Sequence, residues 1–203
     1  MAIFFLTAVI RLSVAQNQLV DTALIEALRQ GDYNIYIRHA ATDWSQNDHV
    51  LTEGDWTSCD PEQMRQLSED GRMQARRIGE AIQRLNIPVC SILSSEYCRA
   101  RETAQLMDLG QVVPTRELMN MRLTHLVGGR STVIKRARQV IGRYPEEGTN
   151  TVLVAHGNLL QAATGEYAVE GGAAVFAPKG DGTFALMALI SPEEWVQLAD
   201  RFE

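Results

Sequence analysis

The chain has 203 residues, of which 45% are hydrophobic and 22% are charged, and its formal net charge is −6. This composition is typical of a soluble globular protein with a single domain, and it excludes the disordered and collagen-like classes. The positive side chains are scattered along the chain. Because nucleic-acid binding requires clustered positive charge, we do not expect a nucleic-acid partner.

The first 15 residues are apolar apart from Arg11, and they end in a small-x-small pattern at residues 13–15 that suits signal peptidase. They resemble a secretory signal, so the single domain of residues 16–203 is expected in the periplasm or outside the cell. Against this, no positive residue precedes the apolar run. The alternative is an apolar helix packed on the domain, or a misplaced start codon, in a cytoplasmic protein. The run is too short for stable membrane insertion.

Apolar periodicity and turn residues predict alternating helices and strands. A helix over residues 19–30 ends at Gly31, a strand follows at 34–38, and a long polar loop covers 41–66. Ser68 is a plausible N-cap for a helix that ends near Leu85. The remaining predicted elements are strands at 89–93, 111–113, 151–155, 173–176 and 183–190, and helices at 96–106, 132–142, 159–163 and from Pro192 onward.

This alternation predicts an α/β three-layer sandwich, with a mainly parallel sheet covered by helices on both faces. In open parallel sheets, ligands bind at the carboxyl ends of the strands. A loop as long as residues 41–66 is usually functional. We therefore expect the functional residues at the strand ends and in this loop.

Two histidines follow predicted strands directly. His39 follows the strand at 34–38 and His156 follows the strand at 151–155, so the two imidazoles converge if those strands are neighbours. Arg38 and Arg99 also belong to strand ends. Two guanidinium groups and two imidazoles suit a phosphate dianion, because arginine offers paired donors to phosphate oxygens. Asn158 opens the helix after His156, whose free N–H groups add to such a site.

Four segments resemble the histidine phosphatase superfamily, which also contains cofactor-dependent phosphoglycerate mutases. IRHAATDW is similar to its Arg-His-Gly-x-Thr-x-Trp signature, and LSEDGRMQARRIGEAI is similar to its Leu-Thr-x-x-Gly-x-x-Gln-Ala helix. ILSSEYCRARETAQLM resembles its Ser-Ser-Pro-x-x-Arg-Ala-x-x-Thr-Ala segment, and TVLVAHGNLLQ its second His-Gly element. These segments fall within residues 34–163, in the order of the family.

The resemblance implies a phosphatase that acts on a small phosphorylated substrate, with His39 as the nucleophile that becomes phosphohistidine. Arg38, Arg99 and His156 are then expected to hold the phosphoryl oxygens. Thr42 is expected to line the pocket, and we expect Asn158 to line it too. Neighbouring guanidinium groups should keep His39 neutral. No metal and no cofactor is expected.

The chain departs from the family pattern at several positions. Ala40 replaces the glycine after the nucleophile, and Ser95-Glu96 replaces a Ser-Pro pair. The usual Leu-x-Glu, which supplies the proton donor, reads here as residues 118–120 and lacks the carboxylate. Glu117 and Asp43 are the candidate replacements, and Glu117 ranks slightly higher.

The cysteines lack the Cys-x-x-Cys spacing of a zinc site. In an exported protein, Cys59 and Cys98 could form a disulfide, whereas Cys90 lies in an apolar run and is expected in the core. Cys59 and Arg65 also have the Cys-x5-Arg spacing of cysteine-based phosphatases. The segment between them contains two acidic residues and no glycine, which argues against an anion-binding loop.

Two other functions stay open. One is a phosphoglycerate-mutase-like phosphotransferase. The other is a catalytically silent module that binds a phosphorylated ligand, suggested by Ala40 and by the missing carboxylate. Trp44 either covers the pocket or packs on the core. His49 and His125 are expected to be surface or hydrogen-bonded core residues rather than catalysts. The sequence does not indicate the substrate or the oligomeric state.

Overall fold

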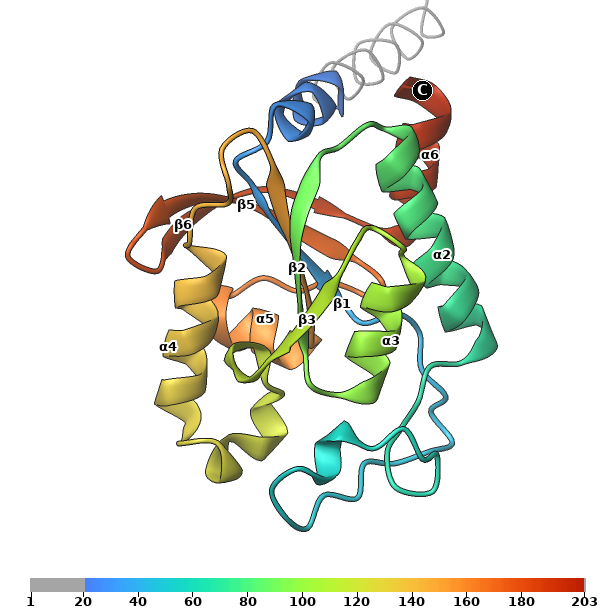
Figure 1. The fold of residues 1–203 in the computed structure, drawn as a ribbon, viewed down its shortest axis with the longest axis vertical. Coiled ribbons are helices and arrows are strands. Elements are labelled where there is room, and N and C mark those ends of the chain that lie inside the picture. The colour runs from blue at the N-terminus through green and yellow to red at the C-terminus, as the bar shows by residue number, and fades with distance from the viewer. Residues whose placement is uncertain (1–20, 203) are drawn as a thin grey trace, which may run out of the picture.

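The computed structural model describes residues 21–202 and shows an α/β three-layer sandwich, with one six-stranded sheet between two layers of helices (Figure 1). The predicted fold class is confirmed. Residues 1–15, the proposed signal segment, lie outside the described residues, as does the start of the helix predicted from residue 19. Residues 21–30 are helical, and Gly31 follows with a φ of 91°.

The sheet is mixed. Its strands follow the order β3-β2-β4-β1-β5-β6, and the first four in this order are parallel. β5 runs antiparallel to β1, and β6 runs antiparallel to β5, so the prediction of a mainly parallel sheet is wrong. The strand bounds are Asn34–Arg38 (β1), Val89–Ser95 (β2), Val112–Thr115 (β3), Asn150–Ala155 (β4), Ala173–Gly180 (β5) and Thr183–Ile190 (β6).

The turn between β5 and β6 explains why these two strands run antiparallel to each other. Asp181 and Gly182 both have positive φ values, 52° and 72°. A two-residue turn with this left-handed backbone matches the twist of two strands in a hairpin and forces them to run antiparallel.

The helices cover both faces of the sheet (Figure 1). α2, α3 and α6 lie on one face, and α4 and α5 lie on the other. Short 3-10 helices occur within the segments that were expected to be irregular. The bounds are Glu69–Arg84 (α2), Cys98–Leu106 (α3), Arg130–Ile141 (α4), Gly157–Thr164 (α5) and Pro192–Phe202 (α6), with Asp55–Thr57 (η1), Arg116–Leu118 (η2) and Met121–Leu126 (η3) for the 3-10 helices.

β1 and β4 form the centre of the sheet, with helices over both faces. Residues 35–37 and 152–155 are fully buried, which explains why both strands are almost continuously apolar in sequence. The polar residues that follow them, His39 and His156, therefore lie together at the carboxyl edge of the sheet.

α2 begins next to this edge. Ser68 is its N-cap, as predicted, and its hydroxyl accepts a hydrogen bond from the Gly71 amide at 3.0 Å. A Cβ atom on Gly71 would lie only 1.9 Å from the carbonyl oxygen of Ala41. Only glycine therefore allows α2 to pack against the backbone two residues after His39.

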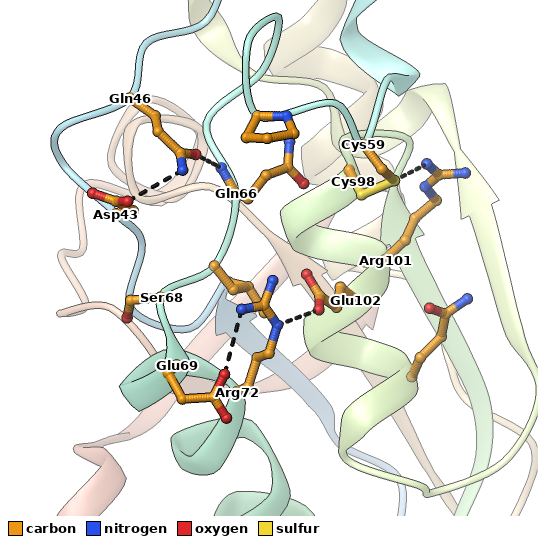
Figure 2. A pocket seen from close by; sticks show the side chains of 13 residues that line it. Asp43, Gln46, Cys59, Gln66, Ser68, Glu69, Arg72, Cys98, Arg101 and Glu102 are labelled. Atoms are coloured by element: carbon orange, nitrogen blue, oxygen red, sulfur yellow. Dashed lines mark hydrogen bonds and ion pairs between the residues drawn. A yellow bond between two sulfur atoms is a disulfide. The ribbon is translucent and has the colours of Figure 1, made fainter.

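A disulfide ties the long loop to α3. Cys59 and Cys98 are bonded, as expected for an exported protein, and Figure 2 shows the bond beside Arg101. Cys59 therefore has no free thiolate to act as a nucleophile, which argues against the cysteine-phosphatase interpretation.

Cys90 does not lie in the core, contrary to the prediction. It is exposed because the register of β2 against β4 shifts between Val89 and Ser91, and Cys90 is the extra residue at this irregularity. A residue at such a bulge leaves the regular alternation of buried and exposed positions.

Replacing both Cys59 and Cys98 by serine should lower the free energy of unfolding. The disulfide spans 39 residues, and closing a loop of this length stabilises the folded state by about 4 kcal/mol in the chain-entropy model. Denaturant unfolding of the oxidised protein measures the difference. Cys90→Ser is the matched control and should leave stability nearly unchanged. A double variant as stable as wild type would contradict the prediction.

Candidate active site

The two histidines meet because β1 and β4 are adjacent and parallel. Arg38 is paired with Ala155 in the register of the two strands, and the His39 amide donates to the Ala155 carbonyl at 2.9 Å. The centroids of the His39 and His156 rings are 5.5 Å apart. The convergence expected from the sequence is therefore present in the structure.

The His39 ring is held in one tautomer. Its Nδ1 lies 3.0 Å from the carbonyl oxygen of Ala40, and since a carbonyl can only accept, Nδ1 carries the proton. Nε2 of the neutral ring then has a free lone pair. Burial lowers the pKa of His39 well below its usual range, and the positive charges of Arg99, Arg38 and Arg65 lower it further. The ring is therefore neutral at physiological pH, as a nucleophile requires.

Ala40, which replaces the family glycine, does not strain the backbone. It is fully buried and is not among the residues with positive φ, so the conformational freedom of glycine is not needed here. Its amide donates to the Thr103 hydroxyl at 3.0 Å. The methyl group is thus accommodated beside the nucleophile.

His156 is fixed by its neighbours on both the side chain and the backbone. Its Nε2 lies 2.8 Å from the Ser95 hydroxyl, and the Tyr36 hydroxyl donates to its carbonyl oxygen at 2.9 Å. Burial lowers its pKa well below the usual range, and Arg99 adds to the effect. Nδ1 is buried and has no partner among residues 21–202.

Arg99 is only 1% exposed and is held by Asp48 in a two-pronged ion pair, with distances of 2.8 Å (Nη1 to Oδ1) and 3.0 Å (Nη2 to Oδ2). Nη1 also donates to the carbonyl oxygen of Arg65 at 3.2 Å. An arginine has five N–H donors. The Nε hydrogen and one Nη2 hydrogen of Arg99 therefore have no partner within the described chain.

Arg38 shows the same pattern. Its Nη1 donates to the Tyr167 hydroxyl and to the Ala168 carbonyl, both at 3.2 Å, and its Nη2 lies 3.4 Å from a carboxylate oxygen of Glu170. Its Nε is buried and has no partner in residues 21–202. Gly157 leaves room for this side chain, since a Cβ there would be 3.0 Å from the Arg38 Cδ.

These groups line one pocket of about 230 Å³. Unpartnered buried nitrogens from four of its residues, Arg38, Arg65, Arg99 and His156, surround it. A buried donor without a partner costs about 1–3 kcal/mol, so the pocket is built to be completed by an acceptor-rich anion. The lining residues are Arg38, His39, Trp44, Arg65, Arg99, Asn120, Arg122, His156, Gly157, Asn158, Gln161 and Tyr167.

The two predicted substrate-binding residues differ in their placement. Asn158 lines the pocket, and its amide donates to Asn120 at 2.8 Å. Thr42 is buried, but it is not among the lining residues, because its hydroxyl donates to Glu170 at 2.9 Å. Thr42 therefore contacts the partner of Arg38 rather than the pocket itself.

Sequence reasoning missed the other arginines of the pocket, Arg65 and Arg122. Arg65 belongs to the loop and was noticed only for its spacing from Cys59. Arg122 follows two residues after Asn120, which occupies the position of the missing carboxylate and also lines the pocket. Trp44 lines the pocket and is 65% exposed, so it covers the pocket rather than the core.

Neither predicted proton donor lies in the pocket. Glu117 pairs with Arg143 at 3.3 Å, and Asp43 accepts hydrogen bonds from Ser45 and Gln46 beside a different pocket, which Figure 2 shows. The structure thus favours neither Glu117 nor Asp43. The carboxylates in contact with the pocket arginines are those of Asp48 and Glu170, which the sequence did not indicate.

Within residues 21–202, no group of three or more His, Cys, Asp or Glu side chains is placed to hold a metal ion. The same part of the chain contains no helix that is both long and apolar enough to cross a bilayer.

Residues 35–131, which contain most of the resembling segments, match the family model of the histidine phosphatase superfamily, branch 1. Over these residues the chain is similar to the histidine phosphatase superfamily. No curated protein sequence matches it.

Solved structures of phosphatases share the fold. The protein histidine phosphatase SixA, complexed with tungstate, has a TM-score of 0.55 at 15% identity, over 79% of this chain and 97% of that chain. The mycobacterial glucosyl-3-phosphoglycerate phosphatase has a TM-score of 0.53 at 20% identity, over 77% and 97%. A phosphoserine phosphatase mutant from Entamoeba histolytica, in complex with phosphoserine, has a TM-score of 0.53 at 16% identity, over 80% and 98%. At these identities the likeness shows the fold alone.

The lowered pKa values of His39 and His156 predict that acid destabilises this histidine phosphatase fold. Below pH 6.5 the unfolded chain binds protons on both histidines, whereas the folded chain does not. The free energy of unfolding should therefore fall as the pH decreases, by up to about 1.4 kcal/mol per pH unit for each histidine.

Urea unfolding between about pH 7 and about pH 5.5 measures this slope. The double variant His39→Gln/His156→Gln should show a shallower slope, whereas His125→Gln, which changes an exposed histidine, should not. Equal slopes in wild type and the double variant would contradict the prediction.

Proposed function

We propose that this chain hydrolyses a small phosphomonoester through a phosphohistidine intermediate at His39. The observation that carries the proposal is the convergence of unpartnered buried nitrogens on the pocket that contains the neutral His39 ring. A phosphoryl group offers three oxygens to these donors and a phosphorus atom to Nε2.

The first step forms the bond between His39 Nε2 and phosphorus and breaks the ester bond, and the leaving oxygen becomes an alcohol by taking a proton from solvent, which the water that attacks in the second step returns. In the second step, water attacks the phosphohistidine and releases inorganic phosphate, which restores the neutral ring. Arg38, Arg99 and His156 donate to the phosphoryl oxygens in both steps. Such a reaction depends mainly on positioning and on neutralising the charge that develops.

Electrostatics in the pocket support this division of roles. Asp48 and Glu170 hold the outer donors of Arg99 and Arg38, so that each arginine keeps its Nε and one Nη2 hydrogen for substrate. These two donors lie on one edge of a guanidinium, the geometry that matches two oxygens of a phosphate. The start of α5, directly after His156, adds backbone N–H groups.

The relatives lend further support. The matching family model is that of the histidine phosphatases, and the structures with the same fold include phosphatases of a protein histidine, of phosphoserine and of glucosyl-3-phosphoglycerate. Asn120, which stands in place of the family carboxylate, favours a second candidate, a module that binds a phosphorylated ligand without turnover.

We also propose that the protein is exported. The disulfide between Cys59 and Cys98 supports this, because such bonds persist mainly in oxidising compartments. Sequencing of the N-terminus of the mature protein tests it: a chain that begins near residue 16 supports export, and an intact Met1 in a cytoplasmic fraction contradicts it.

Labelled phosphate tests the intermediate directly. Wild-type protein mixed with a labelled phosphomonoester panel and denatured rapidly in alkali should carry acid-labile phosphate, since phosphohistidine is stable in alkali and labile in acid. His39→Ala should carry none, because the Nε2 atom that forms the bond to phosphorus is removed. His125→Ala, which changes an exposed histidine, should be labelled like wild type.

Label that persists in His39→Ala would falsify the assignment of the nucleophile. Product analysis separates the remaining alternatives. Inorganic phosphate as the product indicates a phosphatase, and a phosphate group transferred to another position indicates a mutase. Tight binding of phosphorylated ligands without label or product would support the silent module.

A further inference from the structure

The pocket contains more positive charge than its phosphoryl site uses, and Arg65 supplies part of it. The guanidinium of Arg65 lies over the Trp44 ring, 3.8 Å from the ring centroid. Its Nε is buried without a partner, and within residues 21–202 its guanidinium forms no ion pair with a carboxylate. Its main chain is fixed, since its amide donates to Asp48 at 3.1 Å and its carbonyl accepts from Arg99 at 3.2 Å.

Arg122 is the second arginine of the pocket whose guanidinium forms no ion pair within the described residues. It lines the same pocket, its side chain is exposed, and no described residue forms a hydrogen bond or an ion pair with its guanidinium. Its position is set by Asn120, whose side-chain oxygen accepts from the Arg122 amide at 3.0 Å and so caps η3. Arg38 and Arg99, in contrast, are each matched by a carboxylate, from Glu170 and Asp48.

Arg65 and Arg122 line the same pocket, and neither guanidinium forms an ion pair within residues 21–202. Burial and the positive charge of Arg99 lower the pKa of Arg65, the carboxylates of Asp48 and Glu170 oppose this, and Arg122 lowers the pKa slightly. Arg38, Arg65 and Arg99 all lower the pKa values of His39 and His156, whereas Arg122 is not among the charges that do so. Arg122 is the exposed arginine of this pocket, whereas Arg65 is buried.

We propose that Arg65 and Arg122 bind a second oxyanion of the substrate. The substrates are then small phosphomonoesters that carry a phosphate or a carboxylate group a few bonds from the phosphate that is cleaved. This inference rests on the proposed function of the His39 site, and it names the substrate class of that site.

The charge arrangement explains why an oxyanion belongs there. Two guanidinium groups in one pocket repel each other, and an oxyanion that binds both replaces the repulsion with charge-assisted hydrogen bonds. The phosphoryl group at His39 already has Arg38, Arg99 and His156 as donors. The volume of about 230 Å³ is below the range of about 300–1,000 Å³ that is usual for drug-sized ligands, so the second group is part of a small molecule.

Matched substrates test the proposal. Propanediol monophosphate, phosphooxypropanoate and propanediol bisphosphate share one carbon chain and differ only at the far end, which is a hydroxyl, a carboxylate or a phosphate. The kcat/KM of wild type should be at least about ten-fold higher for the two anionic compounds than for the hydroxyl compound. Their inhibition constants against a chromogenic aryl phosphate should follow the same order.

Arg122→Gln should reduce this preference to within about two-fold, because it removes half of the proposed subsite from an exposed position where folding does not depend on it. Arg130→Gln is the matched control. It removes an exposed arginine at the start of α4 that does not line the pocket, and it should keep the preference. The preference of wild type should also weaken as salt is added.

Equal kcat/KM values and equal inhibition constants for the three compounds in wild type would overturn the proposal. An equal loss for all three in Arg122→Gln would also overturn it. Labelling of His39 by the hydroxyl compound tests the proposed phosphatase function independently of the preference for anions. Labelling without a preference for anions leaves the phosphatase intact and removes only the second subsite. Whichever anionic compound is preferred identifies the oxyanion as carboxylate or phosphate.

Discussion

The site depends on the parallel, in-register pairing of β1 with β4. This pairing sets Arg38 beside Ala155, and His39 and His156 follow one residue later on each strand. Both strands are central and buried on both faces, so the register cannot slip without moving apolar residues out of the core. The distance between the two rings is therefore a property of the sheet rather than of a loop.

The long loop supplies what the sheet cannot. Asp48 comes from this loop and fixes Arg99, and the same loop brings Trp44 and Arg65 to the wall of the pocket. It is anchored at several points: the Cys59–Cys98 disulfide ties it to the residue before Arg99, and the buried Trp56 donates to Glu96 at 2.8 Å. Glu96 stands where the family has proline, and its carboxylate helps to anchor the loop by accepting this hydrogen bond from Trp56.

The sequence predicted those parts of the molecule that local pattern determines. The bounds of β1 and β6 match the structure, Ser68 caps α2, and the histidines at the strand ends come together. The prediction of a mainly parallel sheet was wrong for β5 and β6. Asp181-Gly182 is a hairpin signal that could have identified the antiparallel pairing of these two strands. Arg65, Arg122, Asp48 and Glu170 could not be assigned, because they lie in irregular segments whose paths depend on contacts distant in sequence.

Arg38 and Arg99 meet two opposing requirements of a buried cation in a binding site. A buried guanidinium needs an anion nearby, yet an arginine fully occupied by a carboxylate cannot bind phosphate. In both residues the carboxylate takes only part of the donors, so Nε and one Nη2 hydrogen stay free. The carboxylates thus reduce the repulsion among the cations without occupying the edges that face a phosphoryl group. Arg65 and Arg122 form no such ion pair within the described residues, and under the proposal above an oxyanion of the substrate matches their charge.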